Sequence, residues 1–172
     1  GRQHALGCDG VAEIGWFFGH AMTHRSLLIS LLGIASLLTQ PVWAAGDLTK
    51  QEPKRVSVEL SNPEGEKKFT PDTLEFETGT LTVLTISNNS AKSYYFGSNG
   101  LADSVYTRKI VVLDGKKQEP LAEIYGPVRK LEVYPGQSVE WWFVPVRTGT
   151  FDDLVSRKSE AAAGMKGTIE IR

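Results

Sequence analysis

The sequence predicts an all-β protein, an antiparallel Greek-key β-sandwich that follows a cleaved signal peptide. Short stretches such as 55–60 and 69–76 alternate apolar with polar residues, which is typical of half-buried strands. Clusters of Gly, Pro and Asn separate these stretches and indicate turns. No long amphipathic helix is predicted after residue 44, so strands are expected to build the core.

The predicted strands follow one another with short connections. They are expected at 55–60, 69–77, 81–86, 108–114, 121–124, 131–134, 138–144 and 168–172. The stretch 121–124 is expected to pair back on the strand before it, after an Asp-Gly turn. One helical turn is expected at 101–106, and a long exposed loop between Phe151 and Met165. Roughly seven or eight strands of this kind form a sandwich or a barrel.

Composition and charge indicate one ordinary globular domain. The chain has 172 residues and a formal net charge of −1, with 41% hydrophobic and 23% charged residues. A chain of this length leaves no room for a second domain of normal size. The balanced charge provides no strongly basic surface, so nucleic acid is not an expected partner.

The stretch from Met22 to Ala44 has the pattern of a secretory signal peptide. A short basic start precedes an apolar run at 26–38, and small residues end the stretch at Ala44. The apolar run is shorter than a typical membrane-spanning helix, so we expect cleavage after Ala44 and a periplasmic location. An uncleaved leader, which would anchor the protein in a membrane, is the alternative.

This pattern divides the chain into four expected parts. Residues 1–21 would be an upstream extension outside the working protein, and residues 22–44 the signal peptide. Residues 45–54 would be a flexible lead-in, because they are mostly polar. The β-domain would then extend over 55–172.

Removal of the leader limits the chemistry of the mature chain. Cys8 and the three histidines, His4, His20 and His24, all precede the expected cut. Residues 45–172 therefore contain neither the thiol of a disulfide nor the histidine of a Ser-His-Asp or Cys-His pair. We expect that the protein is not an enzyme.

Four sequence pieces stand in a characteristic order along the chain. They are Phe69-x-Pro-x-x-Leu74, Asn88-Asn89 before an aromatic segment, Tyr134-Pro-Gly136, and Gly149-Thr-Phe followed by Ala163-Gly-Met-x-Gly-Thr-Ile169. Together they resemble the cupredoxin family, the small copper proteins that include plastocyanin and azurin. The resemblance covers roughly 56–172, and it implies a cupredoxin-like sandwich with a copper site and a role in electron transfer.

The resemblance also implies where a metal would bind. The family holds copper with one His after the Asn-containing strand and with Cys, His and Met in the last loop, because thiolate, imidazole and thioether ligands suit copper. Here Met165 stands at the Met position, Ser156 at the Cys position and Glu160 at a His position, while Tyr94 or Tyr95 replaces the first His. No ordinary blue-copper centre is expected. The candidate ligands are Met165 and Glu160, for copper or iron.

Each candidate ligand also has a structural interpretation. Met165 beside Gly164 is ordinary core filling unless a partner ligand lies near it. Glu160 would form a hard, oxygen-rich site with Asp152 and Asp153, or these residues form a solvated acidic face. The two aspartates would alternatively accept hydrogen bonds from loop amides.

Aromatic residues provide the candidate interaction surface, Trp141, Trp142 and Tyr94. Neighbouring residues of a strand point to opposite faces, so one tryptophan is expected in the core and the other exposed. Two functions remain open. The first is metal handling or a redox-accessory role with a periplasmic protein or metal transporter as partner, based on the Ala-Gly-Met loop. The second is a metal-free protein-binding module, based on the missing copper ligands.

Overall fold

The computed structural model describes residues 50–172 of the chain. These residues belong to one compact unit, Ala44–Arg172. The predicted upstream extension, the signal peptide and most of the lead-in lie outside the described residues and stay predictions. In the described part, no helix is long and apolar enough to cross a membrane.

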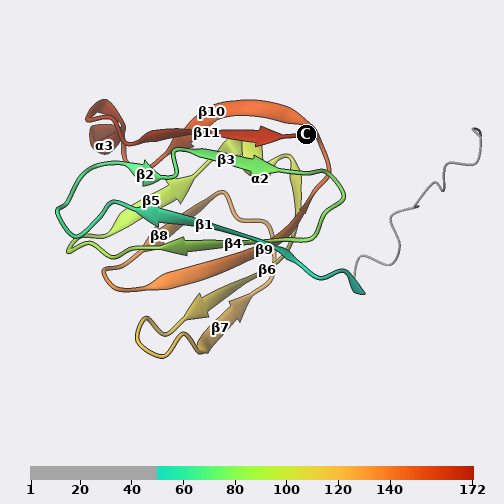
Figure 1. Ribbon diagram of the computed structural model, residues 1–172, viewed down its shortest axis with the longest axis horizontal. Helices are drawn as coiled ribbons and strands as arrows, with labels where there is room; N and C mark the ends of the chain where they lie inside the picture. The colour runs from blue at the N-terminus through green and yellow to red at the C-terminus, as the bar shows by residue number, and fades with distance from the viewer. Residues whose placement is uncertain (1–49) are drawn as a thin grey trace, which may run out of the picture. The chain divides into compact units, whose positions relative to one another are not determined.

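Two β-sheets form this unit, so the predicted all-β sandwich is confirmed (Figure 1). The first sheet has six strands in the order β2-β1-β4-β9-β6-β7, and the second has five in the order β3-β11-β10-β5-β8. Two short helices, α2 (Asn99–Ala102) and α3 (Lys158–Ala162), connect strands. The strands are β1 (Lys54–Leu60), β2 (Phe69–Thr70), β3 (Thr73–Phe76), β4 (Thr82–Ser87), β5 (Tyr94–Gly97), β6 (Val105–Leu113), β7 (Pro120–Ile124), β8 (Lys130–Val133), β9 (Ser138–Pro145), β10 (Gly149–Val155) and β11 (Lys166–Ile171).

Most neighbouring strands are antiparallel, as predicted, but two pairs are parallel. These pairs are β1 with β4 and β3 with β11. The chain leaves the first sheet after β2, forms β3 in the second sheet and returns as β4. Such a crossover lets β4 lie beside β1 in the same direction, which a tight hairpin cannot do. The local alternation of residues does not show these crossovers.

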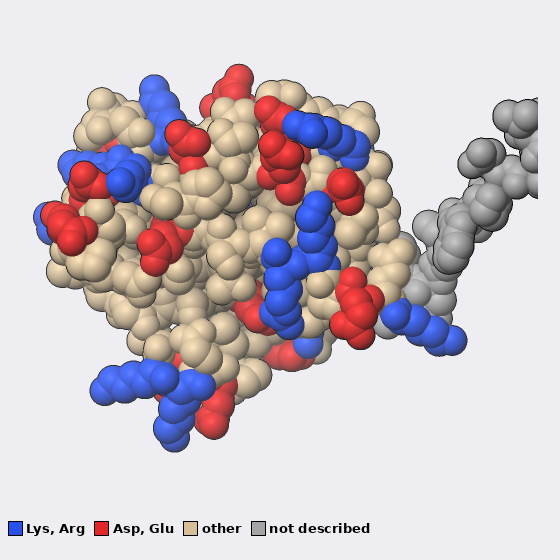
Figure 2. Space-filling view, in the orientation of Figure 1, with Lys and Arg blue, Asp and Glu red and all other residues tan. Residues whose placement is uncertain are grey.

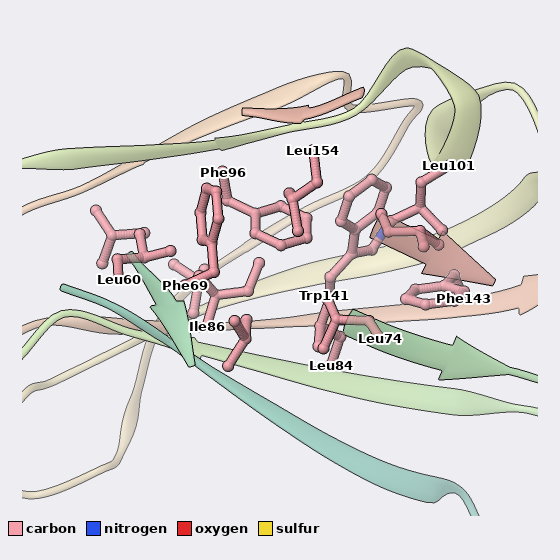
Figure 3. Packing of buried hydrophobic residues seen from close by; sticks show 14 of the residues in the cluster. Leu60, Phe69, Leu74, Leu84, Ile86, Phe96, Leu101, Trp141, Phe143 and Leu154 are labelled. Atoms are coloured by element: carbon pink, nitrogen blue, oxygen red, sulfur yellow. The ribbon is translucent and has the colours of Figure 1, made fainter. Parts of the chain in front are cut away.

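Aromatic and aliphatic side chains fill the space between the sheets (Figure 3). Trp141 on β9 is 1% exposed and packs edge-to-face against Phe96 on β5 of the other sheet, with ring centroids 6.5 Å apart. It packs similarly against Phe143, at 5.5 Å. Its indole N–H donates to the Thr107 hydroxyl at 3.1 Å, so this large side chain is buried without an unpaired donor.

The predicted long exposed loop between Phe151 and Met165 is wrong. Strand β10 continues to Val155, and helix α3 occupies much of the remainder. The adjacent aspartates Asp152 and Asp153 suggest a loop by composition, but hydrogen bonds to other elements fix both within the strand. The connection between β10 and β11 is therefore compact.

The predicted helical turn forms earlier than expected, at Asn99–Ala102. Ser98 precedes it, and its hydroxyl accepts a hydrogen bond from the Leu101 N–H at 3.0 Å. A serine at this position satisfies a backbone donor at the start of a helix. Residues 103 and 104 form a turn after the helix, and β6 begins at Val105.

Candidate functional site

The positions that the resemblance assigns to copper ligands are occupied by residues that bind one another. Ser156 directly follows β10, and its hydroxyl accepts a hydrogen bond from the backbone N–H of Tyr95 on β5, at 2.9 Å. The same hydroxyl donates to the Oε2 atom of Glu160 on α3. One hydroxyl group thus joins the end of β10, the neighbouring strand and the following helix. We call Ser156, Glu160 and the Tyr95 N–H the serine latch.

The carboxyl group of Glu160 is held inside the protein by several contacts. Glu160 is 9% exposed, and its Oε2 atom also accepts a hydrogen bond from the backbone N–H of Arg157 at 3.0 Å. This bond closes the first turn of α3, as a glutamate three residues after a helix cap commonly does. The Glu160 backbone carbonyl accepts from the Met165 N–H at 3.0 Å. Oε2 therefore already has two donors, which leaves at most one oxygen for a metal.

Met165 fills the core, and the glycines beside it have backbone roles. Its side chain is fully buried in the hydrophobic cluster between the sheets. Gly164 has a φ of 101°, a conformation that favours glycine. A Cβ atom at Gly167 would lie 2.5 Å from the backbone oxygen of Asp72 on the neighbouring segment. Packing and backbone geometry thus explain the Ala-Gly-Met-x-Gly motif without a metal.

The two aspartates of β10 bind other segments of the chain. Asp153 accepts a hydrogen bond from the Gly100 N–H at 2.8 Å, and Asp152 accepts one from the Thr168 hydroxyl at 2.8 Å. The hydrogen bond from a backbone amide, one of the alternatives predicted for these aspartates, is therefore present at Asp153. Within residues 50–172, no group of three or more His, Cys, Asp or Glu side chains could hold a metal ion.

The Tyr95 ring lies next to the serine latch and contacts two cations. The Lys130 ammonium is 4.4 Å from the ring centroid, and the Arg157 guanidinium carbon is 4.9 Å from it. Glu132 accepts hydrogen bonds from the Ser93 hydroxyl at 3.0 Å and from Arg157 at 3.3 Å. A hydrogen bond from the Tyr95 side chain, supported by Ser93 and Arg157, lowers the pKa of Glu132 below its ordinary value, while partial desolvation opposes the shift.

Replacing Tyr95 with phenylalanine is expected to raise the pKa of Glu132 towards its ordinary value, because the largest cause of the shift is lost. In the native protein this lowered pKa stabilises the fold above the unfolded-state pKa of about 4.3, and the contribution is lost as the pH falls through the folded-state pKa. An NMR titration of the Glu132 side chain measures the shift. Ser93→Ala is the control and should raise the pKa less; a larger rise in the control would contradict the assignment.

Two of the three residues predicted to form an interaction surface are buried. Trp141 and Tyr94 are 1% and 2% exposed and belong to the core, so neither can contact a partner. Their inward orientation follows from the register of β9 and β5 within the two sheets. Of the two tryptophans, Trp142 is the one on the outer face, as the alternation requires.

Trp142 is half-buried and already has partners on the outer face of the first sheet. Its indole N–H donates to Glu140 at 2.9 Å, and Arg55 and Lys109 lie 5.8 and 5.2 Å from its ring centroid. Arg55 also pairs with Glu140 at 3.0 Å. These charged side chains cover much of the ring, so Trp142 is a poor candidate for the anchor of a contact surface.

Three of the six strongly exposed large hydrophobic residues of the described part lie on and directly after β7, and the prediction missed them. Leu121, Ile124 and Tyr125 are 64%, 47% and 70% exposed. The predicted pairing of this stretch with the strand before it is confirmed, since Ile124 lies opposite Ile110 on β6. The sequence signal for this exposure is the run Pro120-Leu-Ala-Glu-Ile-Tyr125, which places three large apolar residues in six positions.

Comparisons with known proteins support the fold. No family model matches the chain, and no curated protein matches it. Among solved structures, the copper-containing nitrite reductase of Thermus scotoductus SA-01 is similar, with a TM-score of 0.51 and 13% identity over 72% of this chain and 32% of that one. The protein has a cupredoxin-like fold. The chain spans 32% of that reductase, and an identity of 13% supports the fold alone.

Two auracyanins are also similar, at lower scores. Auracyanin B matches with a TM-score of 0.46 and 15% identity, over 74% of this chain and 95% of that one. The auracyanin of Roseiflexus castenholzii matches with a TM-score of 0.45 and 15% identity, over 71% and 99% of the two chains. The fold alone does not settle whether the protein is an enzyme.

The residues present do not fit the copper that a cupredoxin-like fold implies. Residues 50–172 contain neither Cys nor His, the thiolate and imidazole donors that such copper sites use. The hydroxyl of Ser156, which the resemblance assigns to the Cys position, is bonded to Tyr95 and Glu160, and the thioether of Met165 lies in the hydrophobic core. A hydroxyl, a hydrogen-bonded carboxyl and a thioether do not make a blue-copper donor set.

Proposed function

We propose that the protein is a secreted, cupredoxin-like binding module that acts without a blue-copper centre. The observation that carries the proposal is the serine latch, in which the hydroxyl of Ser156 binds both Glu160 and the Tyr95 N–H. The side chains of Ser156 and Glu160, at two positions that the resemblance assigns to ligands, are therefore hydrogen-bonded to each other. The Met165 side chain packs in the core. What the chain offers to a partner is its surface, and exposed apolar residues commonly mark contact sites.

The leader-like pattern at 22–44 supports a periplasmic location within this proposal. A non-catalytic role is part of it as well, because residues 50–172 contain no histidine or cysteine for a nucleophile–base pair. The alternative, metal handling through Met165 and Glu160, would have to use the Oε1 atom of Glu160, because Oε2 already accepts two hydrogen bonds, and it requires Met165 to leave the core.

Copper titration tests the proposal. Calorimetry of the protein with Cu(I), Cu(II) and Fe(II) is expected to show no site that depends on Met165 or Glu160, so the Glu160→Ala and Met165→Leu variants should match the unsubstituted protein. The absorption spectrum with Cu(II) should lack the intense visible band of a copper–thiolate bond. A site that either substitution weakens tenfold or more would replace the proposal with the metal-handling function.

The titration needs a control for the N-terminal residues. Cys8, His4, His20 and His24 can bind copper wherever the leader is retained. The protein is therefore purified after export, and a second sample carries Cys8→Ser with the three histidines replaced by alanine. Copper binding that disappears only in this second sample belongs to the leader and does not bear on the domain.

A further inference from the structure

The chain contains one Asn-Gly pair, Asn99-Gly100, and this pair lies at the start of helix α2. Asparagine is a thermolabile residue, and it deamidates most readily before glycine, because glycine has no side chain to shield its backbone nitrogen. Asn99 is exposed to solvent, so burial does not keep water away from its amide. Whether the pair reacts therefore depends on how its backbone is held.

Deamidation has two steps, and water is its only co-reactant. The backbone nitrogen of Gly100 loses its proton and attacks the Cγ atom of Asn99. The new N–C bond closes a succinimide ring, and the Asn99 side-chain nitrogen leaves as ammonia, which takes up the proton. Water then opens the ring at either carbonyl, which gives aspartate or isoaspartate. The first step needs the Gly100 nitrogen to be free and close to Cγ.

The structure holds the Gly100 nitrogen away from this reaction. Its N–H donates a hydrogen bond to the Oδ2 atom of Asp153 on β10, at 2.8 Å. Asn99 is the first residue of α2, and its backbone carbonyl accepts a hydrogen bond from the Asp103 N–H at 2.9 Å. Closing the ring requires rotation about the Cα–C bond of Asn99 out of the helical range, and this rotation breaks both hydrogen bonds.

The carboxylate of Asp153 is itself fixed in place. Its Oδ1 atom accepts a hydrogen bond from the Ser98 hydroxyl at 2.5 Å, and the same hydroxyl caps α2 by accepting from the Leu101 N–H at 3.0 Å. The register of β10 against β11 shifts between Phe151 and Leu154, in the segment that contains Asp153. One carboxylate thus joins β10 to the first turn of α2 through both of its oxygens.

Packing explains why a glycine follows Asn99. A Cβ atom at Gly100 would lie 2.3 Å from the Cδ1 atom of Phe151 on β10, far closer than van der Waals contact allows. The glycine that makes the pair reactive is therefore required by the packing of α2 against β10. The same packing brings Asp153 to the Gly100 nitrogen.

The side chain of Asn99 has a partner that favours the reaction. The Nη1 atom of Arg129 donates to Asn99 Oδ1 at 3.3 Å, and its Nη2 atom donates to Asp103 at 2.6 Å. A cation bonded to a carbonyl oxygen stabilises the negative charge that develops there during attack on the carbon. The restraint therefore acts on the Gly100 nitrogen and not on the Asn99 carbonyl.

We propose that Asn99 is a deamidation site that Asp153 protects, so that it reacts only when α2 detaches from β10. Segments of a protein open locally without global unfolding, at free energies below that of the whole fold. The product carries a new carboxylate beside Arg129 and Asp103. Basic and acidic side chains are interspersed over the face in Figure 2, and salt screens exposed charges, so one added charge acts locally.

Mass spectrometry of the aged protein tests this protection. The tryptic fragment 93–108 contains Asn99 and no other asparagine, and a blocked synthetic peptide of the same sequence is the unfolded reference. In mildly alkaline buffer, Asn99 of the folded protein should convert at least about tenfold more slowly than Asn99 of the peptide, because only the open state reacts.

A variant of the carboxylate isolates its effect. Asp153→Ala should raise the conversion rate at Asn99 about tenfold and speed the exchange of the Gly100 amide, because both hydrogen bonds of the carboxylate are lost. Asp152→Ala is the matched control, since Asp152 is the preceding residue of the strand and binds Thr168 instead. It should leave the rate at Asn99 and the exchange of Gly100 unchanged.

A core variant separates local opening from global unfolding. Ile86 is fully buried on β4, and Figure 3 shows it at the opposite end of the packed core from Leu101 of α2. Ile86→Ala should lower the stability of the whole protein in urea denaturation, because it leaves a cavity. It should leave the rate at Asn99 unchanged.

Three outcomes would overturn the proposal. Conversion as fast in the protein as in the peptide would show that the fold gives no protection. An unchanged rate in Asp153→Ala would do the same for the carboxylate, and a slower rate would make it the base that removes the Gly100 proton. Equal acceleration by Ile86→Ala would show that the reaction follows global unfolding. If Asp153→Ala does not fold, Ser98→Ala replaces it, with a smaller rise expected because the bond to Gly100 remains.

Discussion

Replacing Trp141 with alanine is expected to lower the free energy of unfolding by about 3–5 kcal/mol, the range for deleting a large aromatic side chain from a core. The indole contacts Phe96 of the second sheet and Phe143 of the first, and it is 1% exposed. Its loss leaves a cavity between the sheets and also removes the donor to the Thr107 hydroxyl. Urea denaturation followed by circular dichroism measures the change.

The adjacent tryptophan is the matched control for this prediction. Trp142→Ala removes the same number of atoms from the same strand, but from the outer face, where Arg55 and Lys109 contact the ring. Exposed cation–π contacts contribute little each, so a loss of about 1–2 kcal/mol is expected. If Trp142→Ala destabilised the protein as much as Trp141→Ala, the assignment of the core to one face of β9 would be wrong.

These tryptophans show how far the sequence can determine the fold. Alternation along 138–144 requires the two rings to lie on opposite faces, and the structure has them so. Which ring faces the core depends on the register of β9, where Trp141 lies opposite Leu84 on one side and Ile110 on the other. Register is a property of distant strands, so local alternation cannot specify it.

The candidate site was only partly predictable for a different reason. Comparison with the cupredoxin pattern identified Ser156, Glu160 and Met165 as the residues at the ligand positions. Tyr95 enters the serine latch through its backbone N–H, a donor that every residue except proline has. No residue type can therefore mark that contact. The exposure of Leu121 and Ile124 could not be predicted either, because it depends on whether distant parts of the chain cover β7.

Replacing Glu160 with alanine is expected to lower the free energy of unfolding by roughly 1–3 kcal/mol, because it leaves buried donors without an acceptor. The hydroxyl of Ser156 and the N–H of Arg157 both donate to the Glu160 carboxyl. Without that carboxyl, α3 loses the bond that closes its first turn, and the end of β10 loses its link to the helix. Urea denaturation gives the stability, and amide exchange of Tyr95 and Arg157 reports the latch directly.

Two further variants decide whether the latch acts as a unit. Glu160→Gln keeps an amide oxygen that can take the place of Oε2 and accept both hydrogen bonds, so it should cost less than Glu160→Ala. Combining Ser156→Ala with Glu160→Ala should cost less than the sum of the single changes, because each single change already breaks the bond between the two residues. Additive losses would show that Ser156 and Glu160 stabilise the protein independently. Non-additive losses with faster Tyr95 exchange in both single variants would show that one hydrogen-bonded serine joins β5, β10 and α3.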